Sequence, residues 1–286
     1  MLQRNGFVFA GILVGTMMLA ACGDDDSDFA TRPDGKDSSS SSVILSSSEG
    51  SSPSSSSSSS SKAKSSSSVA YVEPCRIDSV DSCEYGSLTD SRDGKTYKTV
   101  SIGTQTWMAE NLNYETANSY CYDDEYSKCT KYGRLYLWSA AMDSVGKWSM
   151  NGKGCGYDWP CSPTYPVRGI CPAGWHLPTK AEFETLFTAV GGSSTAGKVL
   201  KSTSGWNSGA GTDAYGFSAL PAGYRGCNGG YYFRNEGRYA VFWSSTEYDS
   251  CHSYYSVYSE EGLYDDIAYL FDSLQCDAIS VRCVKD

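Results

Sequence analysis

Cysteine thiols are the most numerous candidates for chemistry in this sequence of 286 residues, which contains 12 cysteines. The 11 cysteines after Cys22 include no Cys-x-x-Cys pair and no other tight spacing typical of metal ligands. So many cysteines are typical of an exported domain in which the thiols are oxidised. We therefore expect disulfides, with local bridges that join Cys75 to Cys83, Cys121 to Cys129 and Cys155 to Cys161.

Three later cysteines leave an odd thiol. Among Cys227, Cys251 and Cys276, we expect Cys251 to pair with Cys276 and Cys227 to stay free. Cys171 and Cys283 lie in segments that only a long-range contact could bring together.

An apolar segment at the start of the chain ends at Cys22. Residues 7–21 are uncharged, follow Arg4 and end in small side chains. This length suits the core of a signal peptide and is too short for a mature transmembrane helix. The sequence Leu-Ala-Ala-Cys also resembles the bacterial lipobox, which implies cleavage before Cys22 and lipid on its thiol. We expect residues 1–21 to be a lipoprotein signal peptide; an ordinary secretory signal with an incidental cysteine is the alternative.

Four aspartates follow the lipobox, at positions 24, 25, 26 and 28. They resemble the acidic tag that directs lipoproteins of the Bacteroidetes and their relatives to the outer face of the outer membrane. We therefore expect a protein that is lipid-anchored in the outer membrane and displayed at the cell surface. An acidic start to a disordered linker would look the same.

Serine dominates the next segment, with 22 serines among the 31 residues from 38 to 68. Such a composition buries too little apolar surface to offset its ordering entropy. We expect residues 22–72 to be a disordered tether and residues 73–286 to form the folded domain. The formal net charge of -10 argues against nucleic acid or an anionic membrane as the target of that domain.

Local patterns in the domain predict mainly strands. Asp93-Gly94 predicts one hairpin turn, and residues 95–102 and 105–108 predict a second hairpin. The clearest helix begins at Thr179, which forms a capping box with Glu182 and precedes apolar residues at helical spacing up to Gly191. Shorter helices are expected near residues 137–144 and 196–202, and short β runs follow residue 215. The fold class is therefore α+β, with few helices and short strands.

Six sequence strings carry a resemblance to a known family. They are DGKTYKTVSIGTQTWMAENLNY (93–114), KYGRLYLWSAAMD (131–143), GICPAGWHLPTKAEFETL (169–186), GTDAYGFSALPAGYR (211–225), FWSSTE (242–247) and SVRCVKD (280–286). Together they closely resemble the Fibrobacter succinogenes major paralogous domain, and the resemblance covers nearly all of residues 75–286.

One string also points to a wider group. GWHLPTKAEFE is similar to a segment of the formylglycine-generating sulfatase-modifying proteins, whose fold is related to that of C-type lectins. This resemblance implies a C-type-lectin-like domain with short antiparallel sheets, a helix after Leu177-Pro178, and a late sheet that carries Trp243 and Cys283. It also implies that Cys171 pairs with Cys283, which would lie in a last strand over residues 280–284.

Catalytic signals are sparse. The two histidines, His176 and His252, lie far apart, and His176 is expected to pack or to cap a helix. Nucleophile-elbow, metalloprotease and phosphate-loop motifs are lacking, and the late sequence around Cys276 and Cys283 does not match the redox pattern of the formylglycine-generating enzymes. The calcium motifs of lectins are lacking too, and the acidic runs at residues 123–125 and 260–266 are expected to be solvated loops. We expect a protein that is not an enzyme and has no cofactor or metal.

Aromatic residues are dense between Tyr231 and Tyr269. We expect about two thirds of them to pack in a sheet and a subset on the loops to form a platform for a ligand. The expected function is recognition or scaffolding, with polysaccharide or an envelope protein as partner and the membrane bound through Cys22. An enzyme of the formylglycine-generating type and a purely structural envelope protein are the alternatives. The expected ligand-binding residues are Trp243, Tyr254, Tyr255 and Tyr258.

Overall fold

The computed structural model describes residues 71–286, apart from 78–79 and 260–265. The expectations for the signal peptide, for Cys22 and for most of the serine-rich tether therefore lie outside the described residues. Of the expected tether, Tyr71 and Val72 are described, and the Val72 amide donates a hydrogen bond to the Ala189 carbonyl at 2.9 Å. Within the described part of the chain, no helix combines the length and the apolar character needed to cross a bilayer.

The domain is mostly β-sheet with few, short helices. The strands are β1 (Arg76–Ile77), β2 (Val80–Asp81), β3 (Tyr85–Thr89), β4 (Thr96–Ile102), β5 (Gln105–Met108), β6 (Ser119–Tyr120), β7 (Leu135–Leu137), β8 (Trp175–His176), β9 (Tyr224–Gly226), β10 (Tyr232–Arg234), β11 (Tyr239–Glu247), β12 (His252–Ser259), β13 (Ala268–Leu274), β14 (Ala278–Ser280) and β15 (Val284–Lys285). The helices are the 3₁₀ turn η1 (Tyr122–Asp124), α1 (Tyr126–Tyr132), α2 (Trp138–Ala141), α3 (Lys180–Ala189) and α4 (Ser193–Leu200).

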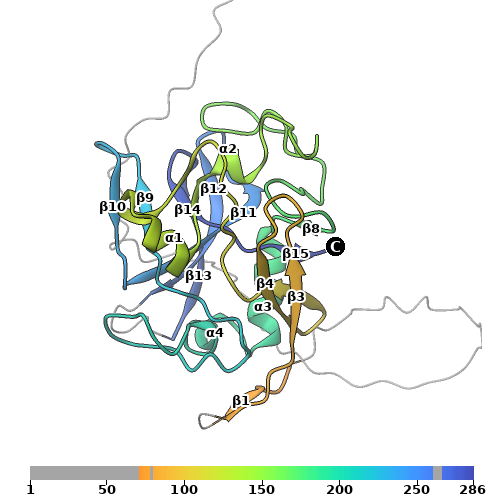
Figure 1. The fold of residues 1–286 in the computed structure, drawn as a ribbon, viewed down its shortest axis with the longest axis vertical. Helices are drawn as coiled ribbons and strands as arrows, with labels where there is room; N and C mark the ends of the chain where they lie inside the picture. The colour runs from red at the N-terminus through yellow and green to blue at the C-terminus, as the bar shows by residue number, and fades with distance from the viewer. Residues whose placement is uncertain (1–70, 78–79, 260–265) are drawn as a thin grey trace, which may run out of the picture.

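These strands form two larger sheets and one small hairpin. An eight-stranded sheet runs in the order β10-β9-β14-β11-β12-β13, with β7 beside β14 and β6 beside β7. A five-stranded sheet has the order β3-β4-β5-β15-β8, so that the end of the chain lies inside it. The β1–β2 hairpin projects from the body at the bottom of Figure 1. One pairing differs from the expected antiparallel pattern, because β14 runs parallel to β11.

The predicted main helix is confirmed in α3. The Thr179 hydroxyl accepts a hydrogen bond from the Glu182 amide, and the Glu182 carboxylate accepts one from the Thr179 amide, which completes the capping box. The apolar face of α3 is buried, and Phe183 lies 5.1 Å from Trp107 between ring centres. The sequence therefore located both the start of this helix and its buried face.

Other expected elements have different limits. The helix expected near residues 137–144 spans only Trp138–Ala141, since Asp143 has a positive φ of 56° that a helix cannot continue through. The helix expected near 196–202 starts earlier, at Ser193. The expected last strand over 280–284 is divided: β14 ends in the larger sheet at Ser280, and β15 begins in the smaller sheet at Val284.

Sheet β11–β12 is covered on both faces, which corrects part of the ligand-binding expectation. Trp243 and Tyr255 lie in one buried cluster, whereas Tyr258 lies in a second with α3 and α4. Trp243, Tyr255 and Tyr258 are at most 2% exposed. These three aromatics stabilise the fold and cannot contact a ligand in this structure; only Tyr254 of the expected set is partly exposed.

Four disulfides join the cysteines that the sequence and the resemblance paired: Cys75–Cys83, Cys121–Cys129, Cys155–Cys161 and Cys171–Cys283. The expected pairing of Cys251 with Cys276 is wrong, because Cys276 bonds to Cys227. Cys227 directly follows β9 and Cys276 lies two residues before β14. These strands pair, so the two Cα atoms lie 5.8 Å apart. No described cysteine is free.

Candidate functional site

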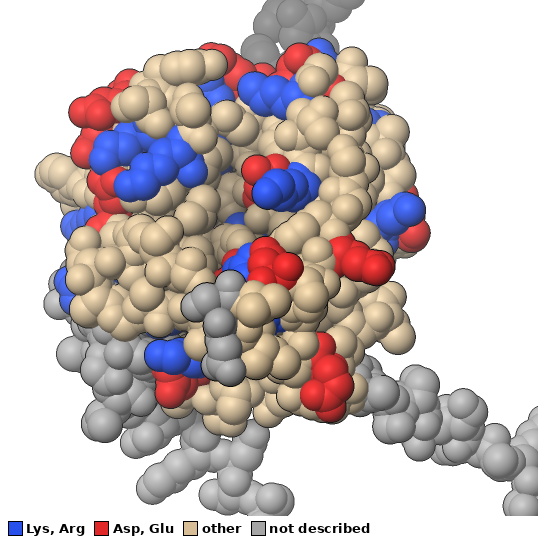
Figure 2. Space-filling model, turned by 60° about the horizontal axis from the view of Figure 1, so that its bottom comes forward, with Lys and Arg blue, Asp and Glu red and all other residues tan. Residues whose placement is uncertain are grey.

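An open pocket of about 240 Å³ lies beside the β1–β2 hairpin. The face that includes the bottom of Figure 1 carries acidic and basic side chains intermixed rather than gathered by sign (Figure 2). Charged, hydroxyl and apolar groups converge on the pocket from three segments of the chain. Its lining residues are Arg76, Asp81, Tyr85, Lys98, Ala109, Glu110, Ser218 and Leu220.

The Cys75–Cys83 disulfide fixes the hairpin that carries Arg76 and Asp81. It closes a loop of eight residues in which Arg76 pairs with Asp81 across the two short strands. The amides of Cys75 and Arg76 both donate to the Ala214 carbonyl, at 2.9 and 3.0 Å. A hairpin this short would be marginal alone, so these bonds hold it against the rest of the domain.

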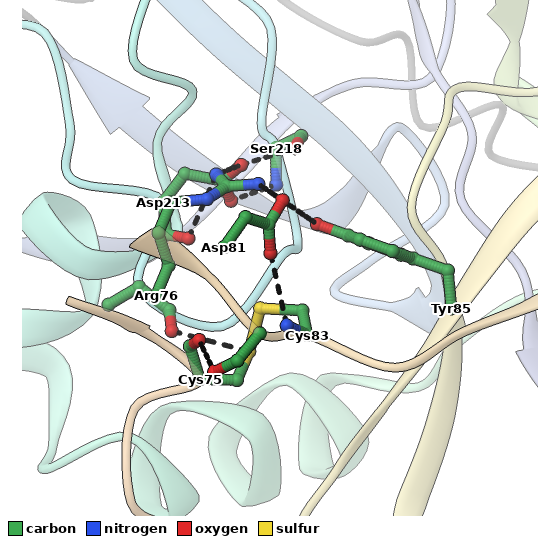
Figure 3. The surroundings of a disulfide bond; sticks show 9 residues. Cys75, Arg76, Asp81, Cys83, Tyr85, Asp213 and Ser218 are labelled. Carbon is green, nitrogen blue, oxygen red and sulfur yellow. Dashed lines mark hydrogen bonds and ion pairs between the residues drawn. A yellow bond between two sulfur atoms is a disulfide. The ribbon is translucent and has the colours of Figure 1, made fainter. Parts of the chain in front are cut away.

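Arg76 is the centre of a polar network (Figure 3). Its guanidinium forms an ion pair with Asp213, and its Nη2 donates to Asp81 at 2.5 Å and to the Tyr85 hydroxyl at 3.0 Å. Burial alone would lower the pKa of Arg76, but the hydrogen bonds with both aspartates outweigh it and raise that pKa. The bond from Arg76 lowers the pKa of Asp81. Both charges therefore stay in place at neutral pH.

Lys98 and Glu110 contribute from β4 and from the residues after β5. The Lys98 ammonium lies 5.4 Å from the centre of the Tyr85 ring, and the Lys98 amide donates to the Glu110 carboxylate at 2.6 Å. Both residues are exposed. Within the described residues, no carboxylate lies at ion-pair distance from the Lys98 ammonium, so this cation can bind an incoming acceptor.

Behind the pocket, the buried Arg282 holds Ser218 in position. Its Nη2 donates to the Ser218 carbonyl at 2.7 Å and its Nε to Asn111 at 2.8 Å, while the Phe217 carbonyl accepts from Nη1. The guanidinium also lies 4.4 Å from the centre of the Phe217 ring. Burial lowers the pKa of Arg282 to about 10, which still leaves it charged at neutral pH. This network fixes the pocket wall before any ligand arrives.

The chemistry of the pocket suits a neutral ligand with many hydroxyl groups. The formal charges of its lining cancel, because Arg76 and Lys98 are balanced by Asp81 and Glu110. Cations and hydroxyls donate to sugar oxygens, and carboxylates accept from sugar hydroxyls. The Tyr85 ring and Leu220 add apolar surface for C–H groups. A few convergent polar groups beside an aromatic ring are typical of a binding site.

The sequence did not single out these pocket residues. They come from residues 76–85, 98–110 and 218–220, and only the tertiary fold brings them together. The one available signal was the short Cys75–Cys83 spacing, which predicted a closed loop but no partner for it. Tyr254, the partly exposed member of the predicted set, lies outside this pocket. Its ring centre is 5.4 Å from that of Tyr248 and 4.2 Å from the Lys180 ammonium.

The residues considered for catalysis have structural partners. His176 lies between Glu182, 2.7 Å from its Nε2, and Asp286, 2.8 Å from its Nδ1, as expected of a packed histidine. Cys276 and Cys283 are both in disulfides. Among the described residues, the one compact group of metal-ligand types contains Cys227, Cys276 and Asp277, but its two sulfurs are bonded to each other.

Comparison with known proteins gives one match. A family model described as the Fibrobacter succinogenes major domain matches residues 100–285. Neither a curated protein nor a solved structure matches the chain. The family match leaves out the β1–β2 hairpin and β3, which provide Arg76, Asp81 and Tyr85 to the pocket.

Proposed function

The chain belongs to the Fibrobacter succinogenes major domain family, and from this premise we propose that it is a surface-displayed lipoprotein whose domain binds polysaccharide without turning it over. Lipid on Cys22 anchors it in the outer membrane, and the serine-rich segment spaces the domain from the surface. The lipobox and the acidic residues after it support this placement. The domain then meets extracellular polymers directly.

One observation carries the binding proposal: the pocket at Arg76 combines balanced charge, fixed donors and acceptors, and an aromatic ring. A free ion would gain little where the formal charges cancel, whereas a sugar can use donors and acceptors together. A site this open gives weak affinity, with a dissociation constant in the range of about 10 µM to 1 mM. This range corresponds to a binding free energy of about 4 to 7 kcal/mol in magnitude. Display of many copies on one surface raises the effective affinity by avidity.

We also propose that the fold is C-type-lectin-like and related to that of the formylglycine-generating proteins. The helix that follows Leu177-Pro178, the position of β15 inside the five-stranded sheet and the Cys171–Cys283 bond support this relation. An oxidase activity of the formylglycine-generating kind is not favoured, because Cys276 and Cys283 offer no thiol here.

Glycan binding by the full chain, purified in detergent, tests the proposed function. Soluble plant and microbial polysaccharides are compared by affinity electrophoresis for the wild type, Tyr85→Ala and Lys98→Gln. Both variants should bind about tenfold more weakly, and Lys147→Gln, an exposed lysine outside this pocket, should bind as the wild type does. If no polysaccharide is retarded by the wild type, or if both pocket variants bind normally, the pocket is not the binding site.

A further inference from the structure

A cation and several aromatic rings pack together at the β9–β10 hairpin. The Arg225 guanidinium lies 4.2 Å from the centre of the Tyr120 ring and 4.3 Å from that of Tyr231. Phe233, which is paired with Arg225 across the two strands, has its ring centre 5.8 Å from the guanidinium. Tyr231 is nonetheless 64% exposed. One side of this tyrosine is thus held by the protein, and much of the rest of the ring faces solvent.

The hairpin beneath Tyr231 is held in place at several points. Its strands pair through Tyr232 with Gly226 and through Arg234 with Tyr224. The Cys227–Cys276 disulfide joins the hairpin to the turn before β14, and the Cys227 amide donates to Asp277 at 2.9 Å. Because the backbone and one side of the ring are already fixed, a ligand that binds Tyr231 loses little conformational entropy in ordering it.

We propose that the exposed side of Tyr231 is a second carbohydrate-contact site, which takes the apolar face of a neutral pyranose ring. The inference rests on the proposed function, because it assigns a further contact to the same class of ligand. None of the residues in this cluster lines the Arg76 pocket. The two sites therefore share no residue, and each can be altered by substitutions that leave the residues of the other unchanged.

The charge of Arg225 selects the class of ligand. A lysine, an arginine or a quaternary ammonium group would also be attracted to the face of an aromatic ring. Here a cation already lies 4.3 Å from the ring centre, so a second cation at Tyr231 would meet like-charge repulsion. A neutral pyranose can bury its C–H groups on the ring without that repulsion. The β9–β10 hairpin therefore suits neutral sugars better than cationic ligands.

Tyr232 extends the same surface around the edge of the sheet. It is 53% exposed, and the Arg234 guanidinium lies 5.8 Å from its ring centre. Tyr231 directly precedes β10 and Tyr232 is the first residue of that strand, so the two exposed tyrosines are adjacent at this end of β10. Since β10 is the edge strand of the sheet, a long polymer can reach either ring.

The test compares four versions of the full chain in detergent: wild type, Tyr231→Ala, Tyr126→Ala and Lys98→Gln. Tyr126 is the matched control, because it is 70% exposed and belongs to α1. Binding is measured by calorimetry with two neutral soluble polysaccharides, mixed-linkage β-glucan and arabinoxylan, and thermal unfolding is followed in parallel. Tyr231→Ala should weaken binding about tenfold without changing the melting temperature, while Tyr126→Ala should bind as the wild type does.

The failures of the two proposals are distinguishable. If Lys98→Gln weakens binding and Tyr231→Ala does not, the second site is refuted and the proposed function stands. If the wild type binds neither polymer, both proposals fail. Equal losses in Tyr231→Ala and Tyr126→Ala would also refute the site, because they would show a general effect of removing exposed tyrosines. A tenfold loss in Tyr231→Ala that Tyr126→Ala does not share supports it.

Discussion

His176 is a buried base between two acids, and its protonation links stability to pH. Burial alone would lower the pKa of His176, but its hydrogen bonds to the Glu182 and Asp286 carboxylates outweigh it and raise that pKa. Burial likewise opposes ionisation of Glu182, yet the bond to His176 lowers the Glu182 pKa. Folding therefore favours the charged forms of both His176 and Glu182.

From these directions we expect a stability maximum in mildly acidic solution. The contribution of His176 is fully present below its unfolded pKa, near 6.5, and is lost as the pH rises through the higher folded value. The contribution of Glu182 is present above its unfolded pKa, about 4.5, and is lost as the pH falls through the lower folded value. Urea unfolding from pH 4 to pH 8.5 measures this. The free energy of unfolding should fall above pH 6.5 in the wild type and in His252→Gln, but not in His176→Gln; parallel curves for all three would contradict the assignment.

Arg282 gives a second prediction at the scale of one side chain. Replacement by Met keeps much of the volume but leaves the Phe217 and Ser218 carbonyls and the Asn111 side chain without their donor. We expect Arg282→Met to lower the free energy of unfolding by about 3 kcal/mol, since buried acceptors lose their partners. Arg282→Lys keeps the charge but not the planar fork, and should recover only part of the loss. Denaturant unfolding measures this loss. An unchanged free energy of unfolding in Arg282→Met would contradict the prediction and show that water replaces the guanidinium.

Among the elements, disulfides that close long loops should contribute most to stability. The Cys171–Cys283 bond closes 112 residues, whereas Cys75–Cys83 closes only eight. In the chain-entropy model, the two bonds raise the free energy of unfolding by about 5 and about 2.5 kcal/mol, respectively. The double variant Cys171→Ser/Cys283→Ser should therefore unfold at a lower denaturant concentration than Cys75→Ser/Cys83→Ser. The reverse order would mean that native contacts of the hairpin, rather than loop length, set the difference.

Elements with strong local signals were predictable, and those that depend on distant contacts were not. The capping box of Thr179 and Glu182 located α3, because both of its hydrogen bonds are local. The partner of Cys227 was missed, since it depends on β9 pairing with β14, more than 50 residues away in the chain. Aromatic density likewise predicted a sheet, but the coverage of both faces of β11–β12 by other segments is tertiary information. The Arg76 pocket was missed for the same reason.

At the scale of the whole molecule, the proposed lipid anchor can be tested separately from ligand binding. Metabolic labelling with a radioactive fatty acid should mark the wild-type chain, and Cys22→Ser should be unlabelled and released or left as an uncleaved precursor. Two or three acyl chains would make release of the wild type slow, since each buried methylene adds about 0.8 kcal/mol. Cys227→Ser, which keeps the lipobox, is the control. A wild-type chain without label would reject the lipoprotein assignment.

The place of β15 between β5 and β8 has a consequence for the order in which the domain can fold. Val284 pairs with Trp107 on one side and with His176 on the other, so the last residues of the chain bridge two segments made long before them. A polypeptide is made from its N-terminus, so β15 is made after β5 and β8, its two neighbours in the sheet. The strand order β3-β4-β5-β15-β8 therefore cannot be completed until Val284 and Lys285 have been made, even if the larger sheet forms earlier.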